Sequence, residues 1–119
     1  RPGALVFFSD EDTGDPEALA RRCAAQGASV YLTHGVGGVS VFERDREWRA
    51  ASLPADSRDP TGAGDCFATT FTVRFAETGD RAAALRWALA AGALATEAAG
   101  IAGIPSREAI ERLVRKEAA

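Results

Sequence analysis

Two apolar runs of strand length, separated by a helix pattern, constrain the fold of this chain most. Ala4 to Phe8 and Ser29 to Thr33 are short apolar segments, typical of strands buried on both faces of a sheet. Between them, Asp15 followed by Pro16 is a helix-start signal, and Gly27 is typical of the residue just beyond a helix C-terminus. A strand, a helix and a strand over about 30 residues form a βαβ unit, so these two strands should be parallel, with a right-handed crossover.

The rest of the chain predicts a hairpin followed by helices. Residues 39–43 and 47–51 have strand character and flank a charged turn at 44–46. Helical patterns then run from the segment after Asp65 to about Thr78, from the cap Asp80 to about Glu97, and from Ser106 to about Lys116. The predicted fold class is therefore α/β, with parallel strands in a layer flanked by helices.

Composition excludes several function classes. The 119 residues are 46% hydrophobic and 26% charged, which fits one globular domain. A net charge of -3 and a pI near 5.1 argue against a nucleic-acid partner. No apolar run approaches the roughly 18 residues of a membrane span, so no membrane partner is expected. Cys23 and Cys66 form no zinc-binding or disulfide spacing, which favours a reducing, cytoplasmic location.

The segment Gly62-Ala63-Gly64-Asp65 is the strongest candidate for chemistry. Its two glycines allow a tight turn into a helix, and the free N–H groups of the first helical turn make a cradle for an anion. The Asp65 carboxylate would repel a phosphate there unless it takes a proton from an attacking hydroxyl. A glycine turn followed by Asp is also an ordinary helix start, and the spacing alone leaves both interpretations open.

The residues around this segment resemble a known family. Residues 59–67, Asp-Pro-Thr-Gly-Ala-Gly-Asp-Cys-Phe, are similar to the C-terminal signature D-T-x-G-A-G-D-x-F of the PfkB (ribokinase-like) carbohydrate kinases, with Pro60 where the family commonly has Thr. Residues 9–12 stand in the place of the family's N-x-x-E segment, and residues 33–38 fit its T-x-G-x-x-G stretch. The resemblance covers essentially the whole chain but only about the C-terminal two-fifths of a family member.

The resemblance implies a role for individual residues. Asp65 would be the catalytic base, and the N–H groups of the preceding turn would form the anion hole: Gly62, Ala63 and Gly64. The nucleotide site would be lined by Thr33, Gly35, Gly38 and Gly64. Asp12 would act on Mg²⁺ through water. Asp59 and Thr61, with the carbonyls near Gly100, would be the candidates for a monovalent-cation site.

The function that the resemblance implies is ATP-dependent phosphoryl transfer to a hydroxyl of a sugar or sugar-like alcohol. A non-catalytic binding module of the same fold, and a kinase of a nucleoside or cofactor precursor, remain open alternatives. Since the chain has no methionine, we expect it to be the back part of a longer protein and to lack the substrate and lid portion. Alone it should be inactive, with apolar surface that seeks the missing portion or a second copy of itself.

The remaining candidate residues are interpreted as structural. We expect His34 to be a solvated loop residue rather than a stack on adenine. Cys66 should pack as a small hydrophobe, since the chain has no second histidine to activate it. The alternating charges of residues 44–49 are typical of a solvated edge, and Trp48 and Trp87 of packing.

Overall fold

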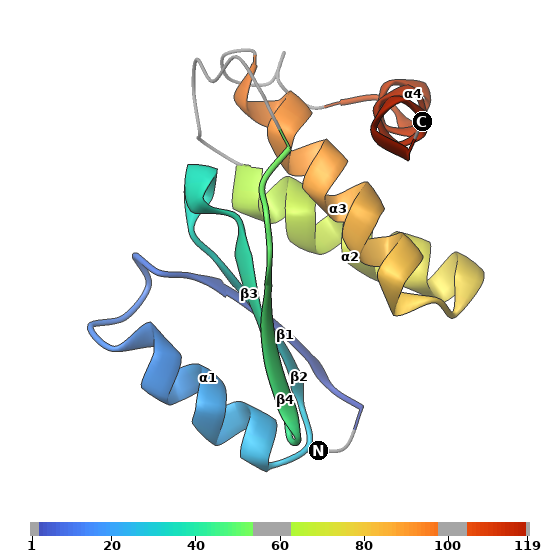
Figure 1. Cartoon of the computed structure of the whole chain (residues 1–119). Helices are drawn as coiled ribbons and strands as arrows, with labels where there is room; N and C mark the ends of the chain where they lie inside the picture. The colour runs from blue at the N-terminus through green and yellow to red at the C-terminus, as the bar shows by residue number, and fades with distance from the viewer. Residues whose placement is uncertain (1–2, 54–62, 98–104, 119) are drawn as a thin grey trace. The chain divides into compact units, whose positions relative to one another are not determined.

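The predicted strand–helix–strand unit forms the first part of the structure (Figure 1). The computed structural model describes residues 3–53, 63–97 and 105–118. They fall into two compact units, Arg1–Ser52 and Leu53–Ala119. In the first unit, β1 (Leu5–Ser9), α1 (Pro16–Ala25) and β2 (Ser29–Thr33) follow one another, and the two strands pair in parallel. The βαβ prediction is confirmed.

The remaining strands make the sheet mixed rather than parallel. β3 (Val39–Glu43) and β4 (Arg46–Ala50) form the predicted hairpin, and the strand order is β1-β2-β3-β4. Both the β2–β3 and the β3–β4 pairs are antiparallel. The expectation of a layer of parallel strands is therefore wrong beyond β1 and β2. The physical reason is the short connection at residues 34–38, because parallel neighbours need a long crossover and antiparallel ones do not.

The core of the first unit lies between α1 and one face of the sheet (Figure 1). The Asp15 carboxylate caps α1 by accepting a hydrogen bond from the Ala18 N–H at 3.2 Å, and Gly27 has the positive φ of 99° expected of the residue beyond a helix end. Small, branched and aromatic side chains fill the interface: Ala20, Ala24, Ala28, Val30, Leu32 and Phe42. Val6 and Phe8 of β1 pack against this cluster. A shift of β1 by one residue would turn both side chains to the other face of the sheet, so their burial favours the observed register.

The second unit consists of three helices, α2 (Ala63–Thr78), α3 (Arg81–Thr96) and α4 (Arg107–Ala118). The start of α3 is set by Asp80, whose Oδ1 accepts hydrogen bonds from two backbone N–H groups at 2.9 and 3.3 Å, and that of α4 by Ser106, whose Oγ accepts one at 3.1 Å. These starts confirm the caps predicted from the sequence. None of the helices in the described ranges is both long and apolar enough to cross a membrane.

A cation–aromatic cluster links the three helices. The Arg74 guanidinium lies 4.0 Å from the centroid of the Trp87 ring, and that of Arg107 lies 5.4 Å from it. Glu77 accepts hydrogen bonds from both arginines, at 3.0 to 3.2 Å. The hydrogen bonds from Arg107, followed by the one from Arg74, lower the pKa of Glu77 and so favour its charged form. Trp87, 8% exposed, is a packing residue as predicted.

Candidate functional site

The glycine loop at residues 34–38 leaves β2 at its carboxyl end, directly after Thr33, and contains the short helix η1 (Gly35–Gly37). Gly35 and Gly38 have positive φ values of 58° and 91°. A Cβ on Gly38 would lie 2.3 Å from the Ala50 carbonyl oxygen, whereas one on Gly35 would have no neighbour within 4 Å. Gly38 is thus required by the packing of the loop on β4, and Gly35 by backbone conformation alone.

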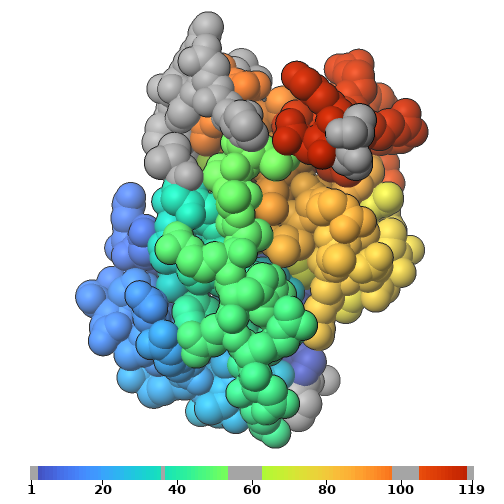
Figure 2. All heavy atoms as spheres, in the orientation of Figure 1, coloured from blue at the N-terminus to red at the C-terminus, as the bar shows by residue number. Residues whose placement is uncertain are grey.

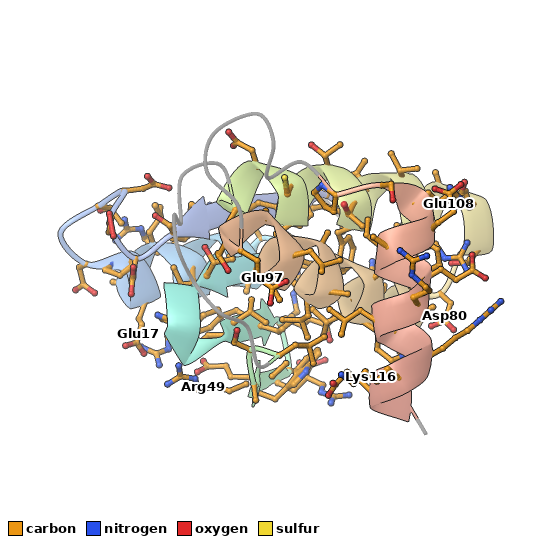
Figure 3. The ribbon with its side chains drawn as sticks, turned by 90° about the horizontal axis from the view of Figure 1, so that it is seen from above. Glu17, Arg49, Asp80, Glu97, Glu108 and Lys116 are labelled. Atoms are coloured by element: carbon orange, nitrogen blue, oxygen red, sulfur yellow. The ribbon has the colours of Figure 1, made fainter. Side chains whose placement is uncertain are left out.

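Arg49 of β4 holds the middle of this loop. Its Nη2 donates a hydrogen bond to the Gly37 carbonyl at 2.8 Å, and Figure 3 shows Arg49 beside the η1 turn. Residues 44–49, the turn and most of β4, are largely exposed, as predicted for a solvated edge, and this segment lies on the surface in Figure 2. Arg49 itself was missed as a loop contact, because its reach depends on the pairing of Arg49 with Ser40 across the hairpin.

The prediction that His34 is a solvated loop histidine is wrong. Its side chain is only 18% exposed, and both ring nitrogens have partners. Nδ1 lies 3.1 Å from Asp10 Oδ2, and Nε2 lies 2.7 Å from Ser40 Oγ. These partners come from the segment after β1 and from β3, the two strands on either side of β2, so the ring joins both of them to the glycine loop.

The segment after β1 presents Asp12 in a fixed, exposed position. Asp12 Oδ2 accepts a hydrogen bond from the Ser9 N–H at 2.8 Å, and the Asp12 N–H donates to the Ser9 carbonyl at 3.1 Å. Within the described residues, no three His, Cys, Asp or Glu side chains gather into a metal site. A lone exposed carboxylate still fits Mg²⁺, which usually keeps several waters and binds one or two carboxylates together with substrate phosphates.

The N-terminus of α2 carries Ala63, Gly64 and Asp65 in its first turn, where backbone N–H groups have no partner within the helix. Gly64 and Asp65 are both exposed. A Cβ on Gly64 would meet nothing within 4 Å, so packing does not require a glycine there. The arrangement places a carboxylate in the first turn of a helix, at the positive end of its dipole, which is a favourable place for an anion.

Cys66 follows Asp65 and is not activated. Burial raises the pKa of its thiol, and the neighbouring negative charge of Asp65 raises it further. A protonated thiol is a poor nucleophile, which favours the interpretation of Cys66 as a packing residue.

Four of the positions named from the sequence lie outside the described residues: Asp59, Thr61, Gly62 and Gly100. Their roles in the anion hole and in a monovalent-cation site therefore stay predictions. Asp12, Thr33, Gly35 and Gly38 belong to the first unit, and Ala63, Gly64 and Asp65 to the second.

Comparison with known proteins identifies one family whose sequence pattern extends over both units. The family model described as pfkB family carbohydrate kinase matches residues 4–107, which includes segments of both units. A ribokinase of Bacillus subtilis is 35% identical over 97 residues, which cover 81% of this chain and 33% of that protein. This chain therefore spans about a third of the length of that relative.

Solved structures have the same fold. An Arabidopsis thaliana ribokinase complexed with ribose and ATP is 25% identical, with a TM-score of 0.79 over 94% of this chain and 41% of that one. An Escherichia coli structure provisionally assigned as ribokinase II, in complex with ATP and Mg²⁺, is 27% identical, with a TM-score of 0.80 over 94% of this chain and 39% of that one. The predicted ribokinase-like architecture, a sheet flanked by helices, is confirmed.

Proposed function

Since this chain belongs to the pfkB family of carbohydrate kinases, we propose that it carries the catalytic part of an enzyme that transfers a phosphoryl group from ATP to a hydroxyl of a sugar. The chain spans only 33% of the Bacillus subtilis ribokinase, so the proposal concerns the activity of the protein that contains this chain. The sugar-specifying residues belong, on this proposal, to the portion that the relatives have in addition.

The observation that carries the proposal is the start of α2. An exposed carboxylate, Asp65, follows an exposed glycine whose side-chain space is open, and packing explains neither residue. A phosphoryl transfer needs both: N–H groups that hold the charge developing on the transferred group, and a base that accepts the proton of the attacking hydroxyl. We assign the first role to the N–H groups of Gly62, Ala63 and Gly64, and the second to Asp65.

The nucleotide part of the site is assigned to the end of β2. Thr33, Gly35 and Gly38 would line it, and the loop between them is held in one shape by Arg49 and by the packing of Gly38 on Ala50. A loop that is already ordered loses little conformational entropy when a ligand binds. The family match includes both the segment with this loop and the start of α2.

Two cations are assigned to residues of this chain, Mg²⁺ and a monovalent cation. Asp12 would hold Mg²⁺ through water, and the ion would neutralise charge on the phosphates of ATP during transfer. Asp59 and Thr61, with carbonyls near Gly100, remain the proposed ligands of a monovalent cation. The ATP and Mg²⁺ of the Escherichia coli structure support the first of these assignments.

Valine in place of Gly64 should weaken the use of ATP without destabilising the fold. Its side chain would enter the space that a phosphate needs, while the fold has room for it, because no atom lies within 4 Å of the Cβ position. We expect kcat/KM for ATP to fall roughly tenfold or more, equivalent to about 1.4 kcal/mol, with little change in the melting temperature. Steady-state kinetics and thermal unfolding measure the two effects.

The matched control is Ala76→Val, which introduces the same side chain at an exposed position near the other end of α2. This variant should keep the kinetic constants of the unchanged protein. Equal kcat/KM values for Gly64→Val and the unchanged protein would contradict the proposal that a phosphate of ATP binds at the start of α2.

We further propose that the 119-residue chain needs a partner. β1 stands at one end of the described sheet, and its five residues, four of them apolar, are only half-buried. Its outer edge would be covered in relatives by the additional portion, or here by a second copy. In sedimentation velocity at micromolar concentration, the isolated chain should self-associate and show no sugar kinase activity. A compact monomer that phosphorylates a sugar would contradict this.

A further inference from the structure

We propose that His34 is a positioning residue of the nucleotide loop: its imidazole, held between Asp10 and Ser40, keeps residues 34–38 in the shape that receives ATP. The inference rests on the proposed function, since it concerns the same loop. It assigns a role to a residue whose position in the T-x-G-x-x-G stretch is otherwise unspecified.

The geometry joins three elements through one ring. Nδ1 lies 3.1 Å from Asp10 Oδ2, and Nε2 lies 2.7 Å from Ser40 Oγ. Asp10 is itself anchored, because its N–H donates to the Thr33 carbonyl at 3.0 Å and so continues the pairing of β1 with β2. Ser40 lies inside β3, opposite Leu32 of β2. The ring is therefore held by the segment at the end of β1 and by a residue within β3, and it follows directly on the end of β2.

The hydrogen-bonding capacities of Asp10, His34 and Ser40 match one another. A carboxylate oxygen accepts from a ring N–H, and the Ser40 hydroxyl can either donate or accept, so both ring nitrogens can be satisfied at once. Serine hydrolases use the same order of groups, but their nucleophile stands on a sharp strand-to-helix turn. Ser40 instead lies within a strand paired on both sides, where its hydroxyl serves the histidine.

The His34 backbone transmits this anchor to the loop. Its N–H donates to the Gly38 carbonyl at 2.8 Å, and its carbonyl accepts from the Gly37 N–H at 3.0 Å. The remaining loop residues include three glycines, which have large conformational freedom unless they are held. With the ring removed, Arg49 and the packing of Gly38 still hold part of the loop, but its first residues lose their anchor to Asp10 and Ser40. The loop should then be less ordered without ATP, and the additional ordering on binding reduces affinity.

The test compares His34→Ala, His34→Gln and Ser40→Ala in the protein that contains this chain. We expect His34→Ala to raise the Kd and KM for ATP roughly tenfold, about 1.4 kcal/mol, with kcat changed less than about twofold. Ser40→Ala, which removes one partner, should have a smaller effect in the same direction. Glutamine offers a donor and an acceptor and should restore much of the affinity. Asp45→Ala, in the exposed turn between β3 and β4, is the control and should change nothing.

Hydrogen exchange supplies a second readout in the absence of nucleotide. In His34→Ala, the amides of Gly37 and Gly38 should exchange faster, while those of β1 and β2 keep their protection. If the unchanged protein binds ATP and His34→Ala binds it equally well, the inference is overturned and the proposed function stands. If the unchanged protein binds no ATP, both are overturned. Should His34→Ala fail to fold, Ser40→Ala decides by the same criteria.

Discussion

Replacement of Asp65 by asparagine should lower the turnover of the kinase by roughly 10²-fold or more and leave ATP affinity nearly unchanged. The amide keeps the size and shape of the carboxylate in the first turn of α2 but cannot accept the proton of the attacking hydroxyl. A positioned general base contributes about 10² to 10⁴ in rate, and this contribution is made in the transition state rather than in binding. Steady-state turnover with ATP, Mg²⁺ and sugar, beside direct titration with ATP, separates the two quantities.

Asp80→Asn is the matched control for this substitution. Asp80 also lies at a helix N-terminus, where it caps α3 (Figure 3), and asparagine caps a helix about as well as aspartate. Turnover should therefore survive in Asp80→Asn. Turnover by Asp65→Asn that matches the unchanged protein would show that Asp65 is not the base, and that the exposed carboxylate at the start of α2 has another role.

Replacement of Gly38 by alanine should unfold or severely destabilise the first unit. The new Cβ would lie 2.3 Å from the Ala50 carbonyl oxygen, in a backbone conformation with φ of 91° that side chains rarely adopt. The oxygen cannot withdraw easily, because Ala50 is paired with Val39 across the hairpin. We expect a loss of at least about 3 kcal/mol, against a typical total stability of about 5 to 15 kcal/mol.

Gly35→Ala provides the comparison that isolates the clash. Gly35 also has a positive φ, but its Cβ position is open, so alanine should cost only about 1 to 2 kcal/mol for the left-handed backbone. Urea unfolding followed by circular dichroism gives both values. Equal losses for the two variants would mean that the approach of Gly38 to β4 does not limit the stability of this unit.

Local signals explain why much of the fold could be predicted from the sequence. The caps Asp15, Asp80 and Ser106 act on N–H groups two or three residues away, so a short stretch of sequence contains all the information that sets a helix start. The two apolar strands likewise predict their parallel pairing. Their expected burial holds for β2, whereas the residues of β1 are only half-buried. The antiparallel pairing of β2 with β3 was not predicted, because it depends on the length of a loop whose glycines were interpreted for their ligand rather than for their turn.

Contacts between distant residues explain what the sequence could not show. His34 meets Asp10, 24 positions away, only because β1 and β2 end side by side. Arg49 reaches Gly37 only through the register of the hairpin. The glycines of the candidate site were treated alike from the sequence, but the structure separates them: packing requires Gly38, while the space at Gly64 is open. That difference makes Gly64 the better indicator of a ligand.

The most direct test of the central claim is the formation of a phosphorylated sugar. The protein that contains this chain should be incubated with ATP, Mg²⁺ and a panel of sugars and nucleosides, with ADP release and the mass of the acceptor product measured together. We predict ADP release that depends on a sugar, with one phosphorylated sugar formed for each ADP. Retained ATP binding without a phosphorylated product from any member of the panel would contradict the claim and favour a non-catalytic module of the same fold.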